Sequence, residues 1–270
     1  MNKYGTTASS IAYATQIAIQ HNIKVLLIST SFNDSLVKDS FWQEKKKSIL
    51  GLGTNSKNVL DTSGIEGLDR IMRSNKVSPE MITDYAKIVL TDRLEILLGI
   101  EGNEGQYSLI KERYPQVITL ASKYYDMVIV DLSRKVGEQT EIEILKASDV
   151  IVATVSQRAK KIKELQEKVK QMDILNENNT ILLLGEYMAE TKYNAKNITR
   201  TLLKRRDLIN TIPYNNIFFE ASQEGKVIDV FLNFMRLKEK DDNYIFIEEI
   251  KRLIETVNIK VEMQQMQKIK

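Results

Sequence analysis

The stretch Lys123-Tyr-Tyr-Asp-Met-Val-Ile-Val-Asp131, followed by Leu132-Ser-Arg134, decides the fold of this chain. Four unbroken apolar residues, 127 to 130, lie between a polar lead-in and a carboxylate. This order is typical of a strand that is buried on both faces of a parallel sheet and presents an acid at its carboxyl edge. Ligands of such sheets bind at that edge. Asp131 is therefore a candidate site residue, placed where a magnesium-bound phosphate would lie. The alternative is that it caps the next turn.

Composition limits the class of protein. At 270 residues the chain is long enough for one large α/β domain or two small ones. It has no cysteine and one histidine, which excludes disulfides and any site built on Cys and His clusters. The net charge of +3 is too small to argue for nucleic acid by itself. Because the chain lacks both a long apolar run and the layout of a signal peptide, we expect a cytoplasmic location.

The N-terminal segment predicts a helix that leads into a parallel strand. Small and apolar residues recur at helical spacing from position 11 to 19, and Lys24-Val-Leu-Leu-Ile-Ser29 has the composition of a buried strand. Gly5, Thr6 and Thr7 then lie at the entrance of the helix. Backbone N–H groups at a helix start attract phosphate, and glycine permits close approach. A simple N-terminal cap is the alternative.

Strands and helices alternate along the rest of the chain. Further strands are predicted at 94–99, 149–155 and 180–185, with a short terminal strand at 216–220. Helices are predicted at 63–74, from residue 79, and at 107–123, 141–147, 162–172 and 197–209, and residues 31–57 are expected to form a loop with a short helix. No composition break interrupts this order. We therefore predict one α/β domain over residues 1–242, doubly wound around a mostly parallel sheet with flanking helices.

Residues 243–270 are predicted to form a C-terminal amphipathic helix or tail. Its apolar residues recur at helical spacing: Ile247, Ile250, Leu253, Ile254 and Val257. Such a helix packs on its own core, packs on a partner, or lies on a membrane surface. Glutamates among its polar residues argue against the membrane, so packing on the core or on a partner is favoured. The lysines between 160 and 170 similarly favour a solvated helix face, balanced by Glu164 and Glu167, over a contact with an acidic partner.

Six segments, taken in order, resemble the MinD/ParA group of P-loop ATPases, and most closely its TadZ/CpaE-like branch. They span roughly residues 1 to 235 and are Gly5-Thr-Thr before a helix, Lys24-Val-Leu-Leu-Ile, Tyr125-Asp-Met-Val-Ile-Val-Asp131, Ser148-Asp-Val-Ile-Val-Ala-Thr-Val-Ser-Gln157, Ile212-Pro-Tyr-Asn-Asn216 and Glu220-Ala-Ser-Gln-Glu-Gly-Lys226. The resemblance implies a P-loop NTPase-like fold, ATP and Mg²⁺ as cofactors, and a homodimer. It also implies roles for the following residues: Lys3, Gly5, Thr6 and Thr7 at the phosphates, Thr7 and Asp131 at the magnesium, and Pro213, Tyr214 and Asn215 at the base.

Departures from the family pattern imply little or no hydrolysis. Family members open with a strand before a loop of the form K-G-G-x-G-K-[ST], and that strand is absent here. Thr6 stands where the phosphate-binding lysine belongs, so Lys3 is a candidate substitute. Ser29 stands where the family places an aspartate implicated in activating water. Either the chain is clipped upstream, or its lineage has dispensed with the first strand.

Two functions follow from the resemblance. The first is a degenerate MinD/ParA-like localisation or scaffolding factor that recruits a partner of pilus or secretion machinery, with weak or no ATP hydrolysis. The second is a slow ParA-like ATPase for DNA or plasmid partitioning, which would bind DNA non-specifically through Arg200, Lys204, Arg205 and Arg206. Peripheral membrane contact through the C-terminal helix is a third interpretation. It would give the protein a membrane-associated or polar location.

Overall fold

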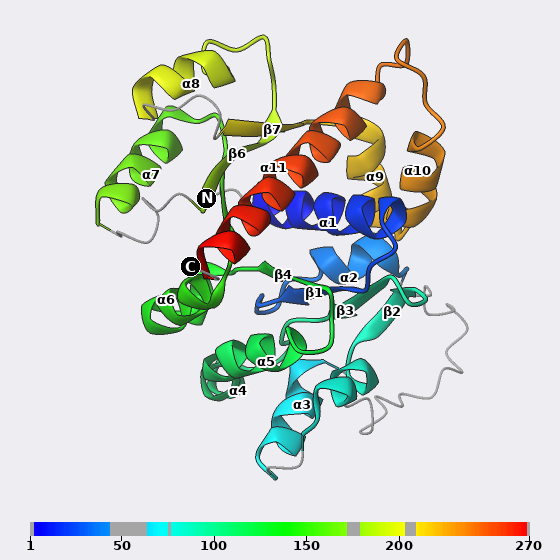
Figure 1. Cartoon of the computed structure of the whole chain (residues 1–270), viewed down its shortest axis with the longest axis vertical. Helices are drawn as coiled ribbons and strands as arrows, with labels where there is room; N and C mark the ends of the chain where they lie inside the picture. The colour runs from blue at the N-terminus through cyan, green and yellow to red at the C-terminus, as the bar shows by residue number, and fades with distance from the viewer. Residues whose placement is uncertain (1–2, 44–63, 75–76, 172–178, 203–208, 269–270) are drawn as a thin grey trace, which may run out of the picture.

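A computed structural model describes residues 3–43, 64–74, 77–171, 179–202 and 209–268 (Figure 1). The strands in these ranges form two sheets, one of four strands in the order β2-β3-β1-β4 and one of three in the order β5-β6-β7. Neighbouring strands are parallel except for the antiparallel pair β2–β3. The strands are β1 (Val25–Ser29), β2 (Lys87–Leu90), β3 (Leu94–Leu97), β4 (Met127–Asp131), β5 (Ile151–Val155), β6 (Thr180–Tyr187) and β7 (Ile209–Pro213).

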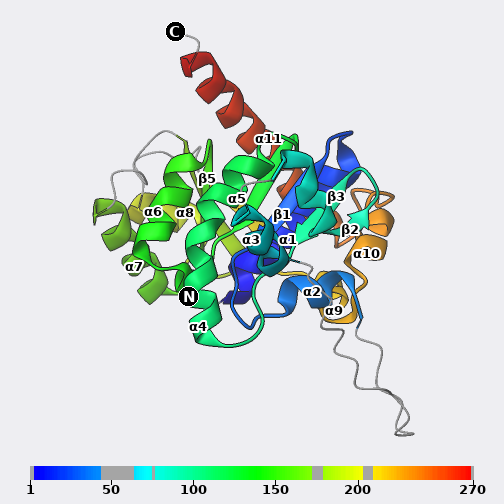
Figure 2. The same ribbon diagram turned by 90° about the horizontal axis from the view of Figure 1, so that it is seen from below.

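Helices cover both faces of these sheets (Figures 1 and 2). The α-helices are α1 (Lys3–Gln20), α2 (Leu36–Phe41), α3 (Ile65–Met72), α4 (Glu104–Ile110), α5 (Tyr114–Ala121), α6 (Glu138–Ala147), α7 (Ala159–Gln171), α8 (Ala195–Leu202), α9 (Asn216–Glu224), α10 (Val227–Phe234) and α11 (Tyr244–Lys268). The described ranges also contain three short 3₁₀ helices, η1 (Pro79–Asp84), η2 (Lys111–Arg113) and η3 (Arg134–Val136).

Alternate residues of β1 face opposite layers, as the pleat of a strand requires. Val25 and Leu27 pack in a cluster with α1, α2, α9, α10 and α11. Leu26 and Ile28 pack in a second cluster with η1 and α3 to α6. In the other sheet, β6 divides its side chains between the α1 cluster and a third cluster with α7 and α8. The predicted doubly wound α/β fold with mostly parallel strands is therefore confirmed.

The strands predicted around residues 24–29, 94–99, 127–131, 149–155 and 180–185 are all present. The predicted terminal strand at 216–220 is wrong, because these residues open α9. Asn215 is the N-cap of that helix, and its side chain accepts a 2.8 Å hydrogen bond from the Phe218 N–H. A capping residue thus outweighs the strand preference of an apolar and aromatic run. The helix predicted over 197–209 is also too long, since α8 ends at Leu202 and Ile209 begins β7.

Three further elements differ from the sequence prediction. The strand β2 was not expected; it forms a hairpin with β3 through a turn in which Asp92 has a left-handed φ of 58°. The helix predicted over 107–123 divides into α4, η2 and α5, with a proline in the first turn of α5. The helix α1 begins at Lys3, so Gly5, Thr6 and Thr7 lie within its first turns and not in a loop before it.

The C-terminal helix α11 packs on the protein's own core. Its apolar residues from Phe246 to Val257 are buried in the same cluster as α1. Beyond them the helix projects from the body of the molecule (Figure 2), and Met263 and Met266 are exposed. Within the described ranges, no helix combines the length and apolarity needed to cross a membrane.

Candidate functional site

The start of α1 lies against the carboxyl end of β4. The Thr7 hydroxyl donates a 2.9 Å hydrogen bond to Oδ2 of Asp131, and both residues are buried. The Ser10 hydroxyl, one helical turn further on, lies 3.5 Å from Oδ1 of the same carboxylate. The fold therefore brings together two residues that are 124 positions apart and that the sequence assigned to one magnesium site.

The turn after β4 holds Asp131 in place through its main chain. Both the N–H and the hydroxyl of Thr30 donate to the Asp131 carbonyl oxygen, at 3.1 and 3.0 Å. The Ser133 N–H donates in turn to the Thr30 hydroxyl at 2.7 Å. The side chain that caps the following turn is Ser133, which accepts from the Lys135 N–H. The Asp131 carboxylate is therefore directed at α1, and the simple capping interpretation is wrong.

The environment of Asp131 disfavours its negative charge. Burial raises the pKa of its carboxyl from 3.8 to about 6, and the nearby charge of Asp34 adds to the rise. The hydrogen bonds from Thr7 and Ser10 act in the opposite direction. A bound cation would relieve this imbalance, because a positive charge stabilises the ionised carboxylate. The sequence analysis did not identify Asp34. Its position shortly after the carboxyl end of β1 could have indicated that it lies near the site.

The donor set fits Mg²⁺ in part. Mg²⁺ prefers hard oxygen ligands and is often held by one or two protein groups together with phosphate and water oxygens. Thr7 and Asp131 provide a hydroxyl and a carboxylate of this kind. Among the described residues no group of three or more His, Cys, Asp and Glu side chains could hold a metal. The remaining ligands would therefore have to come from a nucleotide and from water.

The first turn of α1 offers backbone donors for phosphate. The first four N–H groups of a helix, counted from its N-cap, have no partner within it, and among the described residues they belong to residues 3–5. The side chain of Lys3 is outside the described part of the structure. Glu186, at the end of β6, approaches this turn: a Cβ added to Gly5 would lie 3.8 Å from its Oε2. Its negative charge opposes phosphate, and sequence reasoning missed it.

The predicted base-binding residues lie beside the start of α1. Pro213, Tyr214 and Asn215 line a small cavity of about 30 Å³ together with Gly5. That volume is enough for water and not for a base. The Asn215 side chain is already engaged, since it caps α9 and donates a 2.7 Å hydrogen bond to Oδ1 of Asn243. Tyr214 is 47% exposed. A base would therefore contact Pro213 and Tyr214 at the surface.

The end of β1 carries hydroxyl groups. Ser29 is buried, and its Oγ lies 2.8 Å from Oγ of Ser31. The end of β1, where the resemblance led us to expect an aspartate, therefore carries a pair of neutral hydroxyl groups.

Where the structure describes them, the basic residues lie on solvated helix faces, as the sequence analysis favoured. On α7, Lys161 pairs with Glu164 at 2.7 Å, and Lys168 pairs with Glu141 of α6. Arg200 is exposed on α8, whereas Lys204, Arg205 and Arg206 lie outside the described residues.

Comparison with solved structures identifies the fold. No protein-family model and no curated protein matches the chain. A ParA family ATPase from Chlorobium tepidum TLS superposes with a TM-score of 0.67 at 12% identity, over 96% of this chain and 94% of that one. The septum site-determining protein MinD from Pyrococcus horikoshii OT3, complexed with Mg-ADP, gives 0.64 at 14% identity over 96% and 95%. The MinC:MinD complex of Aquifex aeolicus gives 0.59 at 15% identity over 94% and 92%. At these identities the likeness shows the fold of MinD and ParA ATPases.

Proposed function

We propose that this protein is a positioning factor of the MinD/ParA type that binds Mg-nucleotide and hydrolyses it slowly or not at all. The observation that carries the proposal is the hydrogen bond between Thr7 and Asp131, which sets a hydroxyl and a buried carboxylate beside the first turn of α1. The MinD of Pyrococcus horikoshii, which has this fold, was solved with Mg-ADP.

Each part of the site has one role in this proposal. Thr7 and Asp131 would hold Mg²⁺, and the N–H groups of residues 3–5 would receive the phosphates. Pro213 and Tyr214 contact the base at the surface, next to Gly5. When bound, Mg²⁺ neutralises phosphate charge and links the nucleotide to β4. Nucleotide binding would therefore join the start of α1 to the carboxyl edge of the sheet.

Three features support slow turnover. Thr6 replaces the lysine that would neutralise the β and γ phosphates. Ser29 provides a hydroxyl where a carboxylate would orient water. Glu186 adds negative charge near Gly5. Each of these weakens stabilisation of the charge that develops during phosphoryl transfer, so we expect binding without efficient hydrolysis.

The proposal extends to assembly. We infer a homodimer formed through the nucleotide edge, which recruits a protein partner. The MinD of Aquifex aeolicus supports this inference, since it has the same fold and was solved in complex with MinC. Assignment of the partner to pilus or secretion machinery rests on the resemblance of the sequence to the TadZ/CpaE-like branch. Size-exclusion chromatography with light scattering, with and without Mg-ATP, tests the dimer.

Calorimetric titration with Mg-ATP and Mg-ADP tests the proposed function, with phosphate release followed in the same samples. The variants are Thr7→Ala, Asp131→Asn and, as a matched control, Asp126→Asn. Asp126 precedes β4 at its opposite end, where it accepts a hydrogen bond from the Lys24 N–H. We expect wild type and the control to bind alike, both site variants to lose at least about tenfold in affinity, and release to be negligible. Rapid release that depends on Asp131 would contradict the loss of hydrolysis, and no binding by wild type would contradict nucleotide control.

A further inference from the structure

The path of the chain as it leaves β4 depends on one hydroxyl group. Thr30 is fully buried and follows β1 directly. Its hydroxyl donates to the Asp131 carbonyl oxygen and accepts from the Ser133 N–H, so it joins two points of the turn after β4. A hydroxyl can donate and accept at once, whereas a methyl group of similar size can do neither. Thr30 therefore sets the direction in which the chain leaves β4.

A second hydroxyl holds Thr30 itself. Tyr107 of α4 is buried, and its hydroxyl donates a 3.1 Å hydrogen bond to the Thr30 carbonyl oxygen. Burial raises the pKa of the Tyr107 hydroxyl to about 12, so this group remains a donor near neutral pH. The hydrogen bond fixes the peptide group that follows Thr30. Thr30 therefore cannot rotate away from β4 without breaking it.

Aromatic contacts link α4 to the same turn by a second route. The ring of Tyr107 packs against Phe32, with the two centroids 4.7 Å apart. Lys135, in η3, places its Nζ over the Phe32 ring, 4.8 Å from the centroid. The two routes from Tyr107, one through Thr30 and one through Phe32, therefore meet in the turn that follows β4.

The start of α4 is tied to the segment that follows β1. The Asn33 side chain accepts a 2.8 Å hydrogen bond from the Gly102 N–H and donates one of 3.0 Å to the Gly102 carbonyl oxygen. The next residue, Asn103, is the N-cap of α4. Tyr107 is one of two buried residues on this helix. A displacement of α4 would therefore move Tyr107 relative to Thr30.

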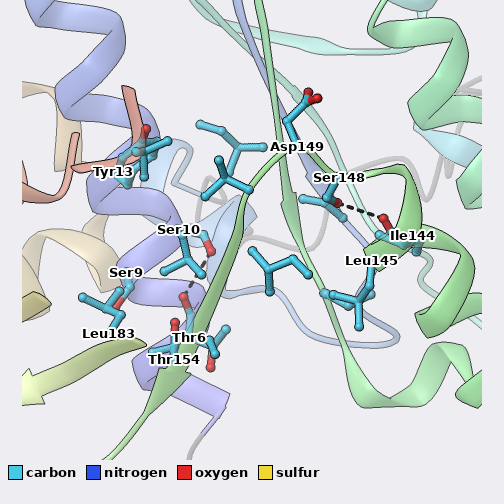
Figure 3. A pocket seen from close by; sticks show the side chains of 18 of the residues that line it. Thr6, Ser9, Ser10, Tyr13, Ile144, Leu145, Ser148, Asp149, Thr154 and Leu183 are labelled. Carbon is cyan, nitrogen blue, oxygen red and sulfur yellow. Dashed lines mark hydrogen bonds between the residues drawn. The ribbon is translucent and has the colours of Figure 1, made fainter. Parts of the chain in front are cut away.

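The α1 side of the candidate site is held differently. The hydroxyls of Thr7 and Ser10, which approach the Asp131 carboxylate, are carried by one helix. Figure 3 shows Ser10 beside Thr6, and the Ser10 hydroxyl donates to the Thr6 carbonyl oxygen at 3.2 Å. The hydrogen bonds of the helix fix these positions relative to one another. The geometry between the hydroxyls and the carboxylate therefore depends on how the chain leaves β4.

We propose that Tyr107 is a positioning residue for the magnesium site and that it couples this site to the position of α4 through Thr30. The inference rests on the proposed function, in which Thr7 and Asp131 hold Mg²⁺. Metal sites depend on the groups that orient their ligands, and loss of such a group weakens metal binding by roughly 10-fold to 100-fold. A change in the position of α4 would therefore lower the affinity for Mg-nucleotide, although no residue of α4 belongs to the proposed site.

Tyr114 provides a matched control. It is fully buried on α5, and its hydroxyl donates a 3.2 Å hydrogen bond to the carbonyl oxygen of Ser29, one residue before Thr30. Main-chain groups of successive residues in a strand point to opposite sides. Because the Thr30 N–H donates to β4 at Asp131, the Ser29 carbonyl points away from β4. Tyr114→Phe therefore removes a similar buried hydrogen bond and leaves the turn after β4 intact.

The first measurement is the gain in ADP affinity that Mg²⁺ gives over EDTA, in wild type and four variants. We expect Thr30→Val to reduce this gain on the order of tenfold and Tyr107→Phe roughly threefold, because Asp131 is no longer held towards Thr7. Affinity in EDTA should not change. Thr30→Ser, which keeps the hydroxyl, and Tyr114→Phe should keep the gain of wild type.

Two outcomes of this measurement would overturn the proposal and leave the proposed function intact. One is a full gain in both Thr30→Val and Tyr107→Phe. The other is an equal loss in Tyr107→Phe and Tyr114→Phe, which would assign the effect to general loss of packing.

Amide hydrogen exchange in the ligand-free protein tests the coupling without nucleotide. The Ser133 N–H loses its acceptor in Thr30→Val. It should exchange on the order of tenfold faster relative to the amide of the buried Leu27, which corrects for global stability. Tyr107→Phe should speed exchange at Ser133 to a smaller extent, and Tyr114→Phe should not.

The exchange measurement separates the coupling from the proposed function. If wild type shows no Mg²⁺ effect on ADP binding, the proposed function fails, and exchange at Ser133 then decides whether Tyr107 fixes the turn after β4. Equal exchange at Ser133 in Tyr107→Phe and Tyr114→Phe would overturn the coupling. This pair of variants also decides the question if Thr30→Val does not fold.

Discussion

Strands β1 and β4 are neighbours with similar apolar sequences, yet they differ in what surrounds them. They pair over five consecutive positions, from Val25 with Met127 to Ser29 with Asp131. Strand β1 has a second neighbour in β3 and is fully buried, whereas among the described strands β4 pairs with β1 alone, and residues 127–130 of β4 line a cavity of about 510 Å³ together with β5. The comparison teaches that two strands of similar apolar sequence differ in burial according to the number of strands that pair with them. The site residue Asp131 thus ends a strand that is held from one side.

The largest expected effect comes from truncating paired side chains on the two strands. Leu27 and Ile129 pair in register and pack in the same cluster, but Leu27 is fully buried and Ile129 is partly exposed. We expect Leu27→Ala to reduce the free energy of unfolding by about 3 to 5 kcal/mol and Ile129→Ala by about half as much. Urea denaturation measures both. Equal losses would show that the edge of β4 is as well packed as β1.

The next effect concerns pH and the charge of Asp131 in metal-free protein. The pKa of its carboxyl in the folded protein, about 6, lies above the ordinary value of 3.8. Between these two pH values the folded state therefore holds a proton that the unfolded chain has released. The ionised carboxylate therefore costs stability above pH 6, and the cost disappears as the pH falls to about 4. We expect Asp131→Asn to raise the free energy of unfolding at pH 7.5, by on the order of 3 kcal/mol for two pKa units, and to change it little at pH 4.

Denaturant titrations of wild type and Asp131→Asn at several pH values check this prediction. Asp126→Asn, on an exposed residue that accepts a hydrogen bond from the Lys24 N–H, serves as the control and should not raise the free energy of unfolding at pH 7.5. A stability difference that is constant with pH would contradict the burial argument.

A smaller effect is expected from Thr7→Val, which keeps the shape of the side chain and removes the donor to Asp131. The lost hydrogen bond should cost about 1 to 2 kcal/mol at pH 7.5. Without that donor the pKa of Asp131 should rise further, because the Thr7 hydrogen bond lowers it. The cost should therefore be smaller at pH 4, where the carboxyl is protonated. Carbon NMR of the Asp131 carboxyl measures the pKa directly, and an unchanged value would contradict this role of Thr7.

The smallest effect is expected from Arg200→Ala. The side chain is exposed on α8, and surface changes of this kind usually alter stability by less than about 0.5 kcal/mol. Under the positioning proposal, wild type and variant should both fail to bind DNA at low salt, as followed by fluorescence anisotropy. Tight, salt-dependent binding that Arg200→Ala weakens would favour a partition function.

Sequence patterns predicted the parts of this fold that depend on the order of residues within a single segment. The unbroken apolar run before Asp131 located β4, and helical spacing after Thr7 located most of α1. The start of α9 was not predictable from side-chain preference, because the Asn215 cap determines it. Asp34 and Glu186 were missed because they approach the site through irregular backbone; Glu186 itself has a left-handed φ of 51°. The cavity was missed because it depends on how strands pair, which one strand's sequence does not reveal.

The most direct test of the central claim is the Mg²⁺ dependence of ADP binding by wild type and Asp131→Asn. If Thr7 and Asp131 hold the metal, wild type should bind ADP at least about tenfold more tightly with Mg²⁺ than with EDTA. The Asp131→Asn variant should bind it with the same low affinity in both conditions. Equal affinity of wild type with and without Mg²⁺, or a Mg²⁺ effect that survives in Asp131→Asn, would contradict the claim.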